Sequence, residues 1–345
     1  MSPTATADRP GAPGTSSSRK GWPSAAVPAD SGVRAVSSEG RQARLDRATE
    51  AGVELSELVQ DPSAFADRLR AAFADLAEAV YREGQQFVAP GIGLTHGVRL
   101  PYQAALRQAL LRRTRHDPAT VMLLLADRLL REPELEARWL AMALLERTVV
   151  TEPERSWQLI RRAAADAGDW ITVDTLAHPA GKGILSQAHR WEELEQLTIS
   201  PSRWERRLVG STIATIPFVD RRAGRAPEVA TRSLALLALL IGEREPDVQK
   251  ALAWAYRSMA LVDRAATTRA LEAEAETASA TADGHRAWVI RDALPKLSPG
   301  DAARIRQTLA GIRRRPGAPS TSTAAGLADR FEAMGLGRRL PEPPL

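Results

Sequence analysis

The stretch that decides the fold is residues 61–80, which read DPSAFADRLRAAFADLAEAV. Its large apolar side chains are 4, 4, 3 and 4 residues apart, a spacing that places them on one face of an α-helix; they are Phe65, Leu69, Phe73, Leu76 and Val80. The stretch opens with Asp61 and Pro62. This pair is typical of a helix start, because proline at the first helical position loses no hydrogen bond and the preceding acid can accept from the free amides.

The same start signal, an acid or a hydroxyl residue followed by proline, recurs at Asp117–Pro118, Glu132–Pro133, Glu152–Pro153, Ser200–Pro201, Glu245–Pro246 and Ser298–Pro299. These starts delimit helices of about 12–18 residues with short connections, and no alternating strand pattern of convincing length appears. The Gly181–Gly183 segment lacks the spacing of a phosphate-binding loop. The pattern indicates an all-α solenoid of helix pairs, with a compact helical bundle as the alternative.

The two ends of the chain differ from this helical part. Residues 1–40 contain 8 Ser, 5 Pro and 5 Gly without a periodic apolar stripe, and Pro316–Ala325 has a similar composition. We expect a disordered N-terminal tail over 1–44, a folded domain over 45–315 and a flexible C-terminal tail over 316–345. The C-terminal tail is expected to contain a short helical end before Pro341–Pro344.

Composition excludes several classes of protein. The 345 residues include no cysteine, which rules out disulfide scaffolds and thiolate metal sites. The longest apolar runs, Val121–Ala126 and Leu234–Ile241, are much shorter than the roughly 18 residues of a membrane span. The start of the chain has no apolar region of signal-peptide type. We expect a soluble cytoplasmic protein, associated with the nucleoid if its partner is DNA, and no membrane contact.

The basic residues are almost all arginine. Of 47 basic residues 4 are lysine, which leaves 43 arginines, and the formal net charge is +5. Arginine is the better bidentate ligand of phosphate, so a polyanionic partner fits; codon bias is the alternative explanation. The histidines show no metal-ligand spacing, and we expect neither a metal nor a cofactor; they are His96, His116, His178, His189 and His285.

Three tryptophans stand beside charged residues at helical spacing: Trp170 with Asp174, Trp204 with Arg207, and Trp254 with Arg257. Residues three or four apart share one helix face, so each indole has a charged neighbour. For each pair the ordinary alternative is a surface pair that covers the core. Four other tryptophans lie at apolar helix positions and are expected to pack in the core; they are Trp139, Trp157, Trp191 and Trp288.

Taken in order, these motifs resemble those of the AlkD-type DNA alkylation repair glycosylases. That family carries Trp-x-x-Val-Asp, Trp-x-x-Arg and Lys-Ala-x-x-Trp-x-x-Arg helices, which this sequence matches at Trp170–Asp174, Trp204–Arg207 and Lys250–Arg257. Gly97–Pro101 and Glu136–Ala141 are similar to two further family motifs. The resemblance covers about residues 65–297. The chain departs from it at Leu261, where the family often has a lysine.

The resemblance implies a right-handed solenoid of HEAT-like antiparallel helix pairs with a concave DNA-binding face. It also implies a slot between Trp170 and Trp254 in which Asp174 is the catalytic carboxylate. Arg207, with Arg257, Arg206 and Trp204, would then contact DNA; for Arg206 a solvated helix face is the alternative. The chemistry fits these residue types, because an alkylated purine is already a cationic leaving group and needs a carboxylate and electron-rich rings rather than a strong acid.

The sequence therefore predicts a monofunctional DNA glycosylase, acting as a monomer on double-stranded DNA, that removes N3- or N7-alkylated purines and leaves an abasic site. The expected substrates include bulky adducts, and housekeeping repair and self-resistance to a DNA-alkylating antibiotic both stay open. The alternative is a non-catalytic helical-repeat scaffold that binds DNA or protein. In the enzyme Trp170, Asp174 and Trp254 should meet, whereas in the scaffold Asp174 is expected in a structural ion pair.

Overall fold

The computed structural model of the protein describes residues 38–318 and 321–335. These residues form helices joined by turns, and no β-strand occurs among them apart from one isolated bridge between Leu94 and Glu134. The all-α prediction is confirmed. In chain order the elements are α1 (Ser38–Ser56), α2 (Pro62–Leu76), α3 (Ala79–Val88), α4 (Leu100–Arg113), α5 (Ala119–Leu130), α6 (Leu135–Thr148), α7 (Pro153–Asp166), α8 (Trp170–Ser186), α9 (Arg190–Gln196), η1 (Leu197–Ile199), α10 (Arg203–Val219), η2 (Ala223–Arg225), α11 (Pro227–Leu240), α12 (Pro246–Val262), α13 (Arg264–Thr281), α14 (Gly284–Ala293), η3 (Leu294–Lys296), α15 (Pro299–Thr308) and α16 (Thr323–Ala333).

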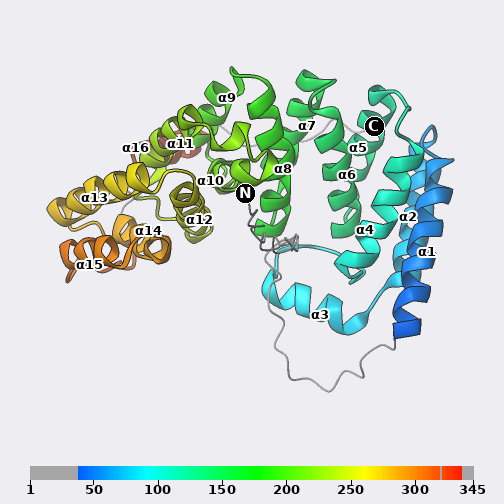
Figure 1. The fold of residues 1–345 in the computed structure, drawn as a ribbon, viewed down its shortest axis with the longest axis horizontal. Helices are drawn as coiled ribbons and strands as arrows, with labels where there is room; N and C mark the ends of the chain where they lie inside the picture. The colour runs from blue at the N-terminus through cyan, green and yellow to red at the C-terminus, as the bar shows by residue number, and fades with distance from the viewer. Residues whose placement is uncertain (1–37, 319–320, 336–345) are drawn as a thin grey trace, which may run out of the picture. The chain divides into compact units, whose positions relative to one another are not determined.

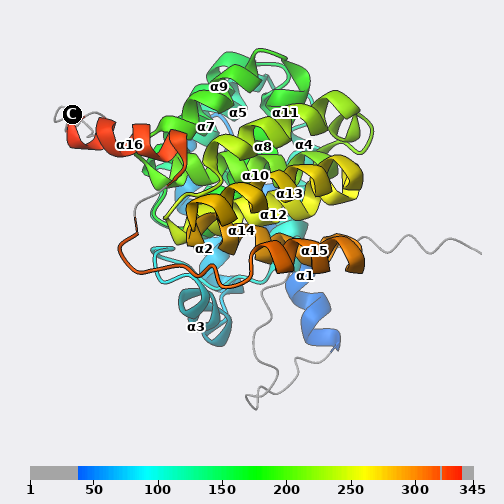
Figure 2. The ribbon, with the colours of Figure 1, turned by 90° about the vertical axis from the view of Figure 1, so that its left-hand side faces the viewer.

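Helices two apart in the numbering pack against one another through the middle of the chain (Figure 1, Figure 2). α6 packs on α8, α8 on α10, α10 on α12, and α12 on α14. The intervening helices pack on their neighbours in sequence, as α5 does on α6 and α7 on α8. Such a succession of helix pairs is what a solenoid requires. The handedness and the concave face stay predictions.

α10 is the most deeply buried of these helices. Every residue from Arg206 to Pro217 is buried, because α8, α12, α7 and α11 all pack on this helix. Its approach to α12 depends on a small residue, since a Cβ at Gly210 would lie 2.9 Å from the carbonyl carbon of Ala251. The buried stretch includes two arginines, Arg206 and Arg207, and both need a buried partner.

The predicted helix starts are confirmed or displaced by one or two residues. α2, α7, α12 and α15 begin at the predicted prolines, and the Asp61 carboxylate accepts from two amides of α2. α5, α6 and α10 begin one or two residues after theirs. Before α6 the Glu132 carboxylate pairs with Arg70 and Arg128 and caps no amide.

The helix face predicted over residues 65–80 is interrupted. α2 ends at Leu76, and Val80 belongs to α3, where its side chain is exposed. The break occurs at Glu78, whose backbone is extended and whose N–H donates to the carbonyl of Gly97. The Glu78 carboxylate also pairs with Arg44 and Arg99, long-range contacts that local periodicity does not reveal.

Helical structure extends into both predicted tails. α1 begins at Ser38, before the predicted boundary, and it packs along α4. Near the other end α16 packs on α11 and η1, with Ala324, Ala325 and Ala328 buried. The rest of the N-terminal tail prediction, and the last ten residues, lie outside the described residues. Among the described helices, none combines the length and the apolar character needed to cross a lipid bilayer.

Candidate functional site

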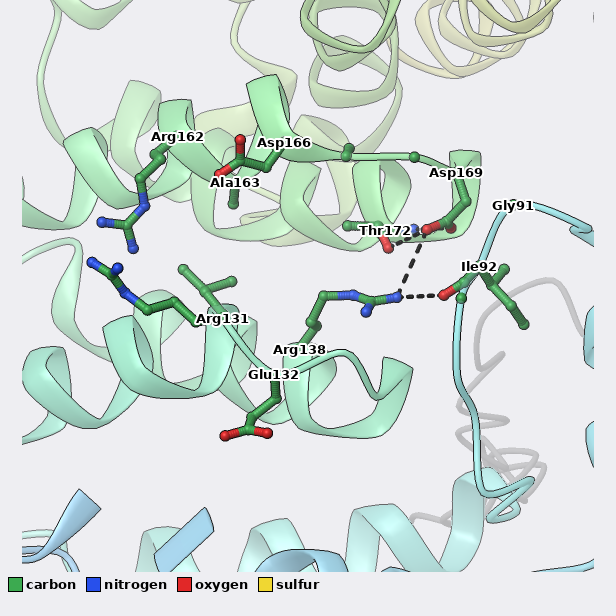
Figure 3. Close-up of a pocket in the computed structure, with 14 residues that line it drawn as sticks. Gly91, Ile92, Arg131, Glu132, Arg138, Arg162, Ala163, Asp166, Asp169 and Thr172 are labelled. Carbon is green, nitrogen blue, oxygen red and sulfur yellow. Dashed lines mark hydrogen bonds and ion pairs between the residues drawn. The ribbon is translucent and has the colours of Figure 1, made fainter. Parts of the chain in front are cut away.

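The start of α8 is fixed by Asp169, which is not among the site residues predicted from the sequence. Asp169 accepts from the N–H of Thr172 at 2.8 Å and from its hydroxyl at 2.6 Å, so it caps the helix. Arg138 of α6 lies 4.0 Å from the Asp169 carboxylate and donates to the carbonyl of Ile92 at 2.6 Å (Figure 3). These contacts fix where α8 begins, and its first residue is Trp170.

Asp174 lies one turn further along α8 and forms a bidentate ion pair with α10. The Arg207 Nε donates to Asp174 Oδ1 at 3.0 Å, and Nη2 donates to Oδ2 at 2.8 Å. The hydroxyl of Ser211 donates to Oδ1 at 2.5 Å. Asp174 is 7% exposed, and burial raises the pKa of its carboxyl above the ordinary value, because desolvation outweighs the opposing effects of Arg207 and Ser211.

Arg207 connects three helices. Besides Asp174 on α8, it donates to the carbonyl of Asp247 in the first turn of α12. Its guanidinium carbon lies 5.8 Å from the ring centroid of Trp170, within cation–π range. The structure therefore brings Trp170, Asp174 and Arg207 together, and Arg207 is 4% exposed. The ion pair of Asp174 is the feature that the scaffold alternative anticipates.

Arg206, the neighbouring residue of α10, was predicted either to contact DNA or to lie on a solvated helix face, and the structure gives it a third environment. It is 4% exposed and its Nε donates to the Glu243 carboxylate at 2.7 Å. Nη1 donates to the carbonyls of Ser200 and Pro201, the turn before α10. Neither a solvated helix face nor an accessible phosphate ligand describes a guanidinium held in this way. The structure gives Arg206 a structural role, which tandem arginines in a sequence do not reveal.

The other predicted site residues have contacts of their own, which do not include the Asp174 cluster. Trp254 is half-buried on α12 and packs against the hydrophobic core, and within the described residues no hydrogen bond or ring contact joins it to Trp170 or Asp174. Trp204 is half-buried and carries the guanidinium of Arg203 over its ring at 4.7 Å. Arg257 pairs with Asp292 and keeps 28% of its side chain exposed.

Two of the motifs found in the sequence contact each other. The buried Glu136 carboxylate accepts from the N–H groups of Gly97 and Val98 at 2.9 and 3.2 Å and from the Thr95 hydroxyl at 2.9 Å. Gly97 has φ of +78°, and a Cβ there would lie 2.6 Å from that of Arg82, so the turn requires glycine. These motifs hold the segment between α3 and α4 against α6 and have a structural role.

A cavity of about 260 Å³ adjoins the start of α8 (Figure 3). Its walls come from the ends of α5 and α7, from α6 and from the segment Gly91–Gly93. The side chains of Arg131 and Arg162 point toward each other at one end, and both pair with Asp127. None of the site residues predicted from the sequence lines this cavity. In the part of the chain that the structure describes, no group of three or more metal-ligating side chains occurs.

Comparison with known proteins identifies the family. No curated protein and no solved structure matches the chain. A family model described as DNA alkylation repair enzyme matches residues 69–297, about two thirds of the sequence. The matched region contains the whole Asp174 cluster together with Trp254 and Arg257. The chain therefore belongs to the family of DNA alkylation repair enzymes, which supports a role in DNA repair.

Proposed function

We propose that the protein is a DNA glycosylase that hydrolyses the N-glycosidic bond of cationic N3- or N7-alkylated purines in double-stranded DNA and leaves an abasic site. The observation that carries this proposal is the cluster of an indole and a carboxylate one turn apart on α8, with Arg207 contacting both. Family membership supplies the DNA repair context.

The proposed chemistry suits a carboxylate with an electron-rich ring beside it. Alkylation at N3 or N7 makes the purine cationic, so the base leaves without being protonated by the enzyme. Positive charge then develops on the sugar, and Asp174 stabilises it by its negative charge and orients the attacking water. The face of Trp170 attracts a cation, as its contact with Arg207 illustrates. Trp254 is proposed as the second indole.

Arg207 has donors to spare in this arrangement. A guanidinium carries five N–H groups, and three of them are engaged by the two Asp174 oxygens and the Asp247 carbonyl. Because Arg207 is 4% exposed, as Arg206 is, we propose that it acts by holding Asp174 beside Trp170, and its two remaining N–H groups can reach a phosphate only if DNA binding opens the surface over α8 and α10. Arg257 is the more accessible phosphate ligand, and such contacts hold DNA without reading its sequence.

A non-catalytic DNA-binding scaffold is the second candidate function, and the burial of the Asp174–Arg207 pair favours it. A pair of this kind is also found where a carboxylate only ties two helices together. The two candidates differ in one outcome, since a scaffold binds alkylated DNA and releases no base.

Release of bases from alkylated DNA tests the proposal directly. The full chain is incubated with duplex DNA that carries 7-methylguanine and 3-methyladenine, and the released bases are separated by chromatography. The proposal predicts free alkylpurine together with an equal amount of abasic sites, and no strand cleavage before alkali treatment. Binding without release would establish the scaffold. A second duplex with a bulky N7 adduct of guanine tests whether large substituents are accepted.

A further inference from the structure

Ser211 is a buried hydroxyl residue that the motifs do not include. It lies on α10 one turn after Arg207, is 0% exposed, and donates to Asp174 Oδ1 at 2.5 Å. Within a helix a serine commonly bonds the carbonyl four residues earlier. The hydroxyl of Thr215, one turn further along α10, lies 3.0 Å from the carbonyl oxygen of Ser211 and shares its single proton between this carbonyl and that of Ala177 on α8. The hydroxyl of Ser211 donates to the carboxylate of Asp174 across the α8–α10 interface rather than to a carbonyl of its own helix.

The two oxygens of Asp174 consequently have different surroundings. Oδ1 accepts from both Ser211 and the Nε of Arg207, whereas Oδ2 accepts from Nη2 of Arg207. A carboxylate oxygen has two lone pairs. Oδ1 is thus fully engaged by α10, and Oδ2 keeps acceptor capacity for another partner.

We propose that Ser211 is a positioning residue, which fixes the plane of the Asp174 carboxylate so that Oδ2 is the oxygen offered to the sugar and the attacking water. This inference rests on the proposed glycosylase function. Ser211 also stabilises the ionised carboxylate, because a hydroxyl that donates to a charged oxygen forms a strong hydrogen bond. It opposes the rise in the pKa of Asp174 that burial causes.

The matched control is Thr215. Its hydroxyl lies at the same interface, is buried like that of Ser211, and has the carbonyl oxygen of Ala177 on α8 at 3.2 Å as one of the acceptors that share its proton. Thr215→Val removes this hydroxyl with little change of volume and leaves Asp174 untouched. Ser211→Ala removes the bond to Asp174, and Ser211→Cys restores a similar shape with a weaker donor.

The experiment compares these variants with the wild-type chain in single-turnover release of 7-methylguanine, together with DNA affinity, over a range of pH. Ser211→Ala should lower the maximal release rate about tenfold and leave the DNA affinity unchanged. In its plot of release rate against pH, the fall on the acidic side, its acidic limb, should shift to higher pH. Ser211→Cys should lie between alanine and wild type, and Thr215→Val should match wild type. Equal rates and equal acidic limbs for Ser211→Ala and Thr215→Val would overturn the role of Ser211.

A second measurement does not depend on the rate. The titration of the Asp174 carboxyl carbon, followed by NMR, should have a higher midpoint in Ser211→Ala than in the wild-type protein and an unchanged one in Thr215→Val. An unchanged midpoint in Ser211→Ala also overturns the inference. If the wild-type chain releases no base, the proposed function fails, and the positioning role fails with it; release by wild type with an unaltered Ser211→Ala refutes the role of Ser211 alone.

Discussion

Two adjacent residues of α10 each form a buried ion pair, and the two pairs differ in what surrounds them. Arg206 pairs with Glu243 and Arg207 pairs with Asp174, and all four side chains are nearly inaccessible. Around Glu243 the partners are backbone groups: its carboxylate accepts from the N–H of Glu245, and its carbonyl accepts from Gln249. Around the second pair they include two side chains: the hydroxyl of Ser211 donates to Asp174, and Arg207 lies over the Trp170 ring besides donating to a backbone carbonyl.

The comparison shows that burial and pairing alone do not identify a functional charge. Arg206 and Glu243 connect the turn before α10 to the turn before α12, and their hydrogen bonds fix these backbone segments. Asp174 is the more exposed of the two carboxylate residues, at 7% against 0% for Glu243, and its pair lies beside Trp170. We interpret the first pair as structural and the second as a structural pair that also serves the proposed chemistry.

The largest expected effect is on stability, and it should be similar for both pairs. Replacing either arginine by methionine leaves a buried carboxylate without its partner, which costs about 3–5 kcal/mol. Arg206→Met and Arg207→Met should each lower the free energy of unfolding by this amount in urea titrations followed by circular dichroism. A loss confined to one variant would contradict the view that both pairs support the core.

The next largest effect is on the rate of base release, and it should be specific to Trp170, the indole beside the Asp174–Arg207 pair. Trp170→Leu should slow release of a cationic base about tenfold, since a desolvated cation–π contact contributes about 1–2 kcal/mol. Trp191→Leu is the control, because Trp191 also has a guanidinium over its ring, that of Arg232 at 6.0 Å. Equal losses of release rate in the two variants would indicate a general packing effect.

The pH dependence of stability should report the buried carboxyl of Asp174. Burial raises the pKa of Asp174 above 3.8, so the folded chain retains this proton where the unfolded chain has lost it. The free energy of unfolding therefore falls as pH rises from 3.8 through the folded-state pKa, by up to about 1.4 kcal/mol per pH unit. Asp174→Asn should abolish this fall, and Glu243→Gln should retain it. Base release should decline as pH drops through the same raised pKa.

The smallest effect concerns the partly exposed Arg257, which belongs to neither pair. If it contacts a phosphate, Arg257→Met should reduce the slope of log affinity against log salt by about 0.9. Arg304 serves as a control of equal charge, because it is 62% exposed and lies outside residues 69–297. Binding titrations at several salt concentrations give both slopes. The same change for Arg304→Met would mean that Arg257 contributes only net charge.

Local rules predicted much of the fold. Acid–proline and serine–proline pairs locate helix starts to within two residues, because proline in the first turn loses no hydrogen bond whatever the rest of the fold, and the side chains of Asp61 and Ser298 cap as well. The break between α2 and α3 was missed, since it depends on Glu78 contacting Arg44 and Arg99 from other elements. The short helical end before Pro341 was predicted and α16 confirms it, but its packing was not foreseen, because the buried alanines of α16 contact α11 and η1 from distant parts of the chain.

For the candidate site, the sequence could predict which residues lie close together within one helix, but not which residues of different helices are in contact. Four-residue spacing put Trp170 and Asp174 within one turn of α8, as the structure has them, whereas Arg207 of α10 was singled out as a DNA contact, which stays a prediction. The pairing of Arg207 with Asp174 joins residues 33 apart, and no spacing rule connects them. Ser211 could have been found once that pairing was known, because it stands four residues after Arg207 on the same helix face.

Single-turnover release of 7-methylguanine by Asp174→Asn and Glu243→Gln tests the central claim most directly. Each substitution replaces the buried carboxylate that pairs with an arginine of α10 by a neutral amide of the same shape. Assayed at a temperature where both variants are folded, Asp174→Asn should lose about a hundredfold or more in rate, the scale of a removed electrostatic contact to a transition state, and Glu243→Gln should keep the wild-type rate. Equal rates for the two variants would contradict the assignment of Asp174 as the catalytic carboxylate.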